Sequence, residues 1–169
     1  MKKIYLILAI ICILTSLTIL LPAVSITENI DNTNYVCKYY GYEVTFGKAN
    51  IPDASGGTYG ATISTSITFS VFVFLAYFLP LIVLLIEVLF NKKSQQGLVI
   101  LSVAFLASTI ILVIITNVTH VSIEVNSGPN YDIHRFSFAS LKFRFSYSTI
   151  IGGIVSLIGC FLAGFKGID

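Results

Sequence analysis

Few residues of this chain have the types and spacing that chemistry requires. Glu87 is the only charged residue within the four long apolar segments of the sequence. A charge inside a membrane-spanning segment is costly, and it often marks an ion or proton pathway. Glu87 lies close to Lys92 and Lys93, so we expect its carboxylate to reach the membrane interface. We therefore predict a structural role for Glu87 rather than a proton-coupled one.

The two histidines, His120 and His134, flank a predicted outer hairpin. A metal site there would need further histidine, cysteine or carboxylate ligands at suitable spacing. If the turn centres on Gly128 and Pro129, Ile123 rather than His120 lies opposite His134. The sequence also contains no Cys-x-x-Cys, His-Glu-x-x-His, Gly-x-Ser-x-Gly or phosphate-binding glycine motif. We predict no catalytic residue, no metal site, no cofactor and no enzymatic activity.

The three cysteines give no basis for a disulfide framework. Cys12 and Cys160 lie in apolar segments, and Cys37 stands alone in the first long loop. A single loop cysteine has no loop partner with which to form an intrachain bridge. We interpret Cys12 and Cys160 as small residues that pack between helices.

These side chains are positioned by four apolar segments of the sequence. The segments lie at about residues 4–24, 67–90, 98–118 and 150–165. Of the 169 residues, 56% are hydrophobic and 11% are charged, and the mean hydropathy is +0.90. Soluble domains contain about 25% charged residues. A helix of about 20 apolar residues crosses the hydrocarbon core of a bilayer, and the first three segments reach that length. We predict a single integral membrane domain over residues 1–169, built as an all-α four-helix bundle.

The first apolar segment also resembles a signal peptide that ends at Ala23-Val24-Ser25. Its apolar stretch is longer than the 7 to 15 residues, roughly, of a signal-peptide core. We favour an uncleaved first span, with cleavage as the alternative.

Positive charges predict the orientation. Lys2 and Lys3 precede the first span, Lys92 and Lys93 lie in the short link at 91–97, and Lys166 follows the last span. Lysine and arginine concentrate in the cytoplasmic segments that flank spans. We predict a multi-pass protein of the plasma membrane with both termini cytoplasmic. The long loops at 25–66 and 119–149 are then extracellular.

Alternating patterns predict strands in both outer loops. In residues 35–46, hydrophobic side chains such as Tyr42 and Val44 alternate with Glu43 and Thr45. This period of two is typical of a strand with one buried face. Residues 121–125 and 141–147 show the same alternation. We predict that the two loops together form one small extracellular antiparallel β-layer.

Tyrosines are concentrated in these loops, which contain seven of the nine in the chain. Amphipathic rings can form a belt at the level of the lipid headgroups or cover a small sheet, and we favour this interpretation. The functional alternative is a recognition surface for another protein. The residues of that possible interaction surface are Tyr39, Tyr40, Tyr42, Phe46, Phe143 and Phe145.

The last apolar segment contains a row of small residues. Gly152, Ser156, Cys160 and Gly164 recur every four residues. Small residues at this spacing allow helix backbones to approach closely within a membrane. We predict that the row packs against other helices of the same chain, with contact to a partner protein as the alternative.

The order of these features resembles uncharacterised small four-pass membrane proteins of Gram-positive bacteria and mycoplasmas. The resemblance rests on the Tyr40-Gly41-Tyr42-Glu43-Val44-Thr45-Phe46-Gly47 segment before the second span and on the glycine-rich last span. It implies no activity. The topology alone is also similar to that of claudins, four helices with an extracellular sheet. The claudin Trp-Gly-Leu-Trp motif and paired loop cysteines are absent, which argues against a junction-forming role.

These observations favour a non-enzymatic structural or protein-interaction component of the plasma membrane. Its partners would be the lipid bilayer and either another membrane protein or a second copy of the chain. The net charge of +2 is too small and too scattered for a nucleic-acid partner. The alternative is a small transporter or channel subunit, which needs a polar path through the bundle. Candidates for that path are Thr15, Ser16, Thr18, Ser102, Ser108 and Thr109.

Overall fold

The computed structural model describes residues 2–30, 33–52, 62–90, 95–127, 130–137 and 144–168. Its helices, in chain order, are α1 (Lys2–Leu17), the short 3-10 helix η1 (Thr18–Leu20), α2 (Gly41–Phe46), α3 (Val71–Phe90), α4 (Gln95–Val113), α5 (Ile115–Val118) and α6 (Tyr147–Ile168). Its strands are β1 (Pro22–Ile30), β2 (Thr33–Tyr40), β3 (Lys48–Pro52), β4 (Thr62–Ile67), β5 (His120–Ser127), β6 (Asn130–Ser137) and β7 (Arg144–Phe145).

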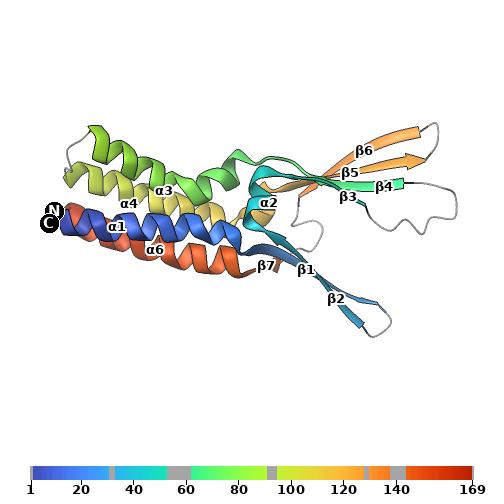
Figure 1. Cartoon of the computed structure of the whole chain (residues 1–169), viewed down its shortest axis with the longest axis horizontal. Coiled ribbons are helices and arrows are strands. Elements are labelled where there is room, and N and C mark those ends of the chain that lie inside the picture. Colours follow the sequence, from blue (N-terminus) through green and yellow to red (C-terminus); the bar gives the residue numbers. More distant parts are fainter. Residues whose placement is uncertain are drawn as a thin grey trace.

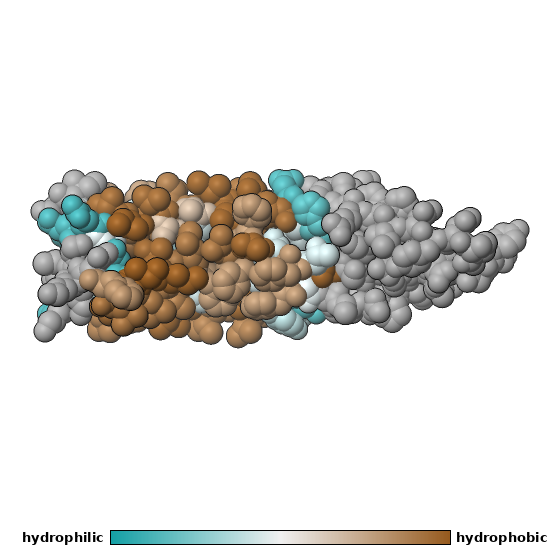
Figure 2. Space-filling model, turned by 90° about the horizontal axis from the view of Figure 1, so that it is seen from above, coloured by the Kyte–Doolittle hydropathy of each residue, from teal (hydrophilic) through white to brown (hydrophobic). Residues whose placement is uncertain are grey.

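Helices and strands occupy opposite ends of the molecule (Figure 1). Within the described part of the chain, four helical segments are long and apolar enough to cross a membrane: Lys3–Leu20, Val71–Phe90, Gln95–Val113 and Tyr147–Gly167. The beginning of α1 and the end of α6 lie away from the strands, as do the end of α3 and the beginning of α4 (Figure 1). Figure 2 shows a band of hydrophobic side chains over the helices, with hydrophilic residues at both of its edges.

All four long helical segments differ in their ends from the apolar segments, and the first, second and fourth show the reason. The first helical segment ends at Leu20, because Pro22 to Val24 belong to β1. The second begins at Val71, since Ile67 is the last residue of β4. The fourth is the longest helix of the bundle, with 22 residues, although its apolar segment is the shortest. Polar residues extend α6 at the sheet end, where the Ser148 and Thr149 hydroxyls donate hydrogen bonds to backbone carbonyls.

The described strands form two antiparallel sheets, whereas the sequence predicted one layer. One sheet has the order β2-β1-β7 and the other the order β3-β4-β5-β6. Each sheet combines strands from both long loops, so the prediction that the loops pair with each other is confirmed. The β5–β6 hairpin also has the predicted register, with Ile123 opposite His134 and Ser127 opposite Asn130.

The strand predicted over residues 35–46 was wrong in its second half. Strand β2 ends at Tyr40, and Gly41–Phe46 form α2. The Glu43 carboxylate accepts a hydrogen bond of 3.0 Å from the Tyr40 N–H, and the Thr45 hydroxyl donates one of 2.7 Å to the Gly41 carbonyl. The first bond satisfies the N–H that precedes the helix, as in a capping box, and the second lies within the first turn.

The structure describes residues 144–147 of the last predicted strand, at 141–147. In that part Arg144–Phe145 form β7, and Tyr147 begins α6 rather than continuing the strand. Residues 138–143, which include Phe143, lie outside the described residues.

The buried core has two parts. One lies at the far end of the bundle and contains Tyr5, Leu8, Cys12, Leu84, Leu98, Leu101 and Phe105. The other lies where helices meet strands and contains Ile19, Val24, Val44, Ile67, Val73, Tyr77, Leu112 and Ile115. This second cluster joins residues of α3, α4 and α5 to residues of α2, β1 and β4, so the sheets share a core with the bundle.

Candidate functional site

The helix–sheet junction brings α2 into direct contact with the end of the bundle. The Gly41 N–H donates a hydrogen bond of 2.9 Å to the Leu21 carbonyl. A Cβ atom at Gly41 would lie 2.7 Å from the Ile19 carbonyl oxygen and 2.9 Å from the Tyr77 hydroxyl. A real Cβ does not tolerate such contacts, so only glycine allows α2 to sit this close to η1 and α3.

A chain of hydroxyl groups lies beneath α2. The Tyr77 hydroxyl is 2.6 Å from the Ser148 hydroxyl, which donates a bond of 2.7 Å to the Thr18 carbonyl. Because the single proton of Ser148 is used on Thr18, Tyr77 is the donor to Ser148. Tyr77 and Ser148 are fully buried. This chain connects α3, α6 and η1 at the level where α2 rests.

Exposed aromatic rings cover the outer side of this junction. Tyr42 and Phe46 of α2 are 44% and 55% exposed, and Tyr40 stacks on Tyr42 with a centroid distance of 5.7 Å. Phe46 contacts Phe74 of α3 edge to face at 6.2 Å. Phe74 in turn stacks on Phe78 at 4.9 Å. The aromatic row therefore continues from α2 down the side of α3.

Only three of the six residues predicted for the interaction surface lie together in the structure. Tyr40, Tyr42 and Phe46 lie together at α2. Tyr39 packs against the buried cluster of the junction. Phe145 is on β7 and lines a separate groove between α4 and α6. Phe143 lies outside the described residues.

All six hydroxyls proposed for a polar path donate to backbone carbonyls. Ser16 donates to Tyr77 of α3 at 2.9 Å, and Ser102 donates to Cys160 of α6 at 2.9 Å. Ser108 donates to the Ala76 carbonyl of α3. The remaining three, Thr15, Thr18 and Thr109, donate to carbonyls of their own helical segment. These hydroxyls tie helices together or bond locally, and their protons do not point into an open path.

The row of small residues on α6 faces α4 and η1. A Cβ at Gly152 would lie 2.8 Å from the Thr18 hydroxyl oxygen, and one at Gly164 would lie 3.0 Å from the Ser102 hydroxyl oxygen. The fully buried Ser156 donates a bond of 2.9 Å to the Phe105 carbonyl. The row is therefore used inside the chain, at the contact between α4 and α6.

Glu87 does not extend to the interface as expected. Its side chain is only 2% exposed and turns into the bundle. A Cβ at Gly97 would overlap its carboxylate, so Gly97 makes room for Glu87 between α3 and α4. Glu87 is thus buried between α3 and α4 at the end of the bundle away from the sheets.

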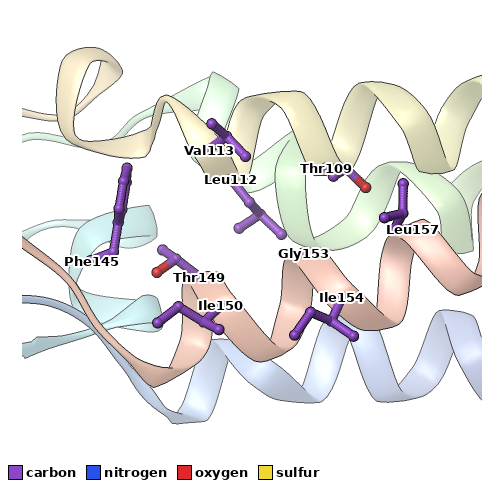
Figure 3. Close-up of a pocket in the computed structure, with 9 residues that line it drawn as sticks. All are labelled: Thr109, Leu112, Val113, Phe145, Thr149, Ile150, Gly153, Ile154 and Leu157. Carbon is purple, nitrogen blue, oxygen red and sulfur yellow. The ribbon is translucent and has the colours of Figure 1, made fainter.

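A further feature, the α4–α6 groove, was not predicted from the sequence. It has a volume of about 230 Å³ and lies near the sheet end of the bundle (Figure 3). Its lining comes from α4 (Thr109, Leu112, Val113), α6 (Thr149, Ile150, Gly153, Ile154, Leu157) and β7 (Phe145). The one feature of the sequence that could have indicated this groove is Gly153, which lies next to the small-residue row but is not part of it.

No group of metal-ligating residues gathers in the part of the chain that the structure describes. The His120 ring lies 3.4 Å from the Val118 carbonyl oxygen, and His134 pairs with Ile123 on the neighbouring strand. Comparison of the chain with protein-family models, curated proteins and solved structures gives no match. The resemblance to small four-pass membrane proteins stays a prediction.

Proposed function

We propose that this chain is a non-enzymatic interaction protein of a plasma membrane, in which a closed helix bundle holds two extracellular sheets. The observation that carries the proposal is the junction at Gly41, where α2 rests on η1 and Tyr77 with no room for a side chain. Because α2 connects β2 of one sheet to β3 of the other, this packing holds one end of each sheet against the helices. Strands that are held in place in this way are suited to binding another protein.

The orientation follows from the basic residues at the other end. Lys3 begins the first span, and Lys166 lies in the last turn of α6. Both are at the end of the bundle opposite the sheets (Figure 1). Positive charges favour the cytoplasmic side, so this end is cytoplasmic and the sheets are extracellular.

The proposed contact surface is the aromatic face of α2, formed by Tyr40, Tyr42 and Phe46. Tyrosine and phenylalanine are enriched at protein interfaces, and exposed aromatic groups supply a large contact area. The partner is another membrane protein or a second copy of the chain, since Phe46 contacts Phe74 within the second apolar helix.

The competing function is a small transporter or channel subunit. A polar path needs groups that can bind a solute or water along the bundle. Ser16, Ser102 and Ser108 instead bond to backbone carbonyls of neighbouring helices. This bonding supports the interaction protein over the transporter.

Site-specific photo-cross-linking in intact cells tests the proposal. A photoreactive phenylalanine analogue replaces Phe46 in one full-length variant and Leu89 in a control. Leu89 is 72% exposed and lies near the opposite end of α3. We expect the Phe46 position to form a discrete protein adduct and the Leu89 position to form none of that size.

Two outcomes would contradict the proposal. Lipid adducts alone at position 46 would identify α2 as part of an aromatic belt. Solute flux across vesicles that contain only the purified chain would favour the transporter instead.

A further inference from the structure

We propose that the α4–α6 groove binds one acyl chain of a membrane lipid, in the leaflet next to the sheets. The proposal rests on the membrane placement proposed above. Its starting point is Gly153, which forms the middle of the α6 wall (Figure 3).

Gly153 has no packing role within the protein. A Cβ at this position would meet no atom within 4 Å, whereas one at Gly152 or Gly159 would clash with a neighbouring side chain. Glycine in a helix interior is less favourable than alanine. At Gly152 and Gly159 close packing accounts for glycine, but at Gly153 it does not. The space that Gly153 leaves is therefore available to a molecule outside the chain.

The lining of this space presents hydrocarbon. Leu112, Ile150, Ile154 and Leu157 contribute aliphatic side chains. The two hydroxyls are used elsewhere: Thr109 donates to the Phe105 carbonyl at 3.0 Å, and Thr149 donates to the Ser146 carbonyl at 2.8 Å. The groove thus offers dispersion contacts and apolar burial, and no polar group that would select a headgroup.

The direction and length of the groove fit an acyl chain. Its α6 residues run from Thr149 to Leu157 along one face of the helix, so the groove follows the helix axis. At a rise of about 1.5 Å per residue this wall is about 12 Å long. One leaflet of the hydrocarbon core is about 15 Å thick. Phe145 of β7 lies at the sheet end, at the level expected for the headgroups.

A second helix fits this groove less well than a hydrocarbon chain. Helices in membranes approach each other closely where both rims of the contact carry small residues. Here Gly153 lies between bulky exposed side chains, with Val113 60%, Ile150 54% and Ile154 57% exposed. These rims hold a helix backbone away from Gly153, but a flexible acyl chain can lie between them.

The test uses the full-length chain in vesicles of phosphatidylcholine and phosphatidylglycerol that contain a small fraction of phosphatidylcholine with a diazirine in mid-chain. After photolysis, mass spectrometry maps the labelled residues. The groove-filling variant is Gly153→Leu, which places its side chain in open space. The control is Val103→Leu, which adds bulk at an exposed position of α4 outside the groove.

We expect labelling to be concentrated at Gly153, Ile154 and Ile150, well above that at exposed Ile158. Gly153→Leu should reduce this labelling several-fold, and Val103→Leu should leave it unchanged. The proposal would be overturned if each residue were labelled in proportion to its exposure. It would also be overturned if Gly153→Leu did not reduce the labelling of the groove residues.

Covalent dimers that cross-link through α6 in place of lipid adducts would also overturn it, because they would make a second copy the occupant.

Alkaline extraction of the same vesicles distinguishes a failure of the membrane placement from a failure of the groove proposal. A chain that is extracted contradicts the membrane placement and with it the groove. A chain that is retained but uniformly labelled contradicts the groove alone.

Discussion

At the scale of single residues, hydroxyl groups that donate across helices stabilise the bundle. Ser156 of α6 donates to the Phe105 carbonyl of α4, whereas Thr15 donates to Ile11 within α1. Interhelical hydrogen bonds in membranes contribute about 0.6 kcal/mol on average and up to about 1.7 kcal/mol. We expect Ser156→Ala to lower the free energy of unfolding by an amount in this range.

The matched control is Thr15→Val, which keeps the side-chain shape and removes a bond within one helix. We expect a smaller loss than for Ser156→Ala. Reversible unfolding in mixed micelles measures both variants, and equal losses would contradict a special role for bonds between helices.

Tyr77 makes the hydroxyl contact that lies directly beneath α2. Tyr77→Phe removes the donor to Ser148 but leaves the Ser148 bond to the Thr18 carbonyl in place. A hydrogen bond contributes about 1 kcal/mol to stability. We therefore expect Tyr77→Phe to lower the free energy of unfolding by about this amount, measured in the same micelles. Unchanged stability would show that the Tyr77 hydroxyl contributes nothing at the junction.

At the scale of elements, α2 depends on the missing side chain of Gly41. Gly41→Ala would push a methyl group against the Ile19 backbone and the Tyr77 hydroxyl. Overpacking of this kind costs about 1 to 3 kcal/mol. We expect Gly41→Ala to speed hydrogen exchange of the α2 amides and to leave α4 protected. Gly153→Ala is the control, because its methyl group meets open space, and it should change neither.

The same element shows why part of the fold was not predictable from the sequence. Tyr42, Val44 and Phe46 have the alternation of a strand, yet Val44 is fully buried while Tyr42 and Phe46 are exposed. The helix forms because Glu43 satisfies the Tyr40 N–H and because Gly41 fits under η1. The second of these conditions involves residues distant in sequence, which a local pattern does not reveal.

Two other local patterns gave correct predictions. The turn after Ser127 gave the register of the β5–β6 hairpin, and long apolar segments gave the four long helices. The division into two sheets depends on the pairing of Val24 with Phe145, which joins distant segments. Likewise, the burial of Glu87 against Gly97 and the α4–α6 groove depend on how helices pack, which hydropathy does not determine.

At the scale of the whole molecule, the helices separate two regions of opposite character. The lysines at Lys3 and Lys166 lie at one end, and the sheets with the aromatic face of α2 lie at the other (Figure 1). A helix of 20 residues such as α3 is about 30 Å long, which matches the hydrocarbon core of a bilayer. With the membrane placement proposed above, the two ends lie on opposite sides of the bilayer.

Cysteine accessibility determines which end is which. In a variant in which Cys12, Cys37 and Cys160 are replaced by alanine, single cysteines are introduced by Gln96→Cys and Tyr42→Cys. Both residues are exposed, at opposite ends of the bundle. Because lysines favour the cytoplasmic side, a membrane-impermeant maleimide should label Tyr42→Cys in intact cells and Gln96→Cys only after lysis. Labelling of Gln96→Cys in intact cells would reverse the orientation and place the sheets, with any partner of α2, in the cytoplasm.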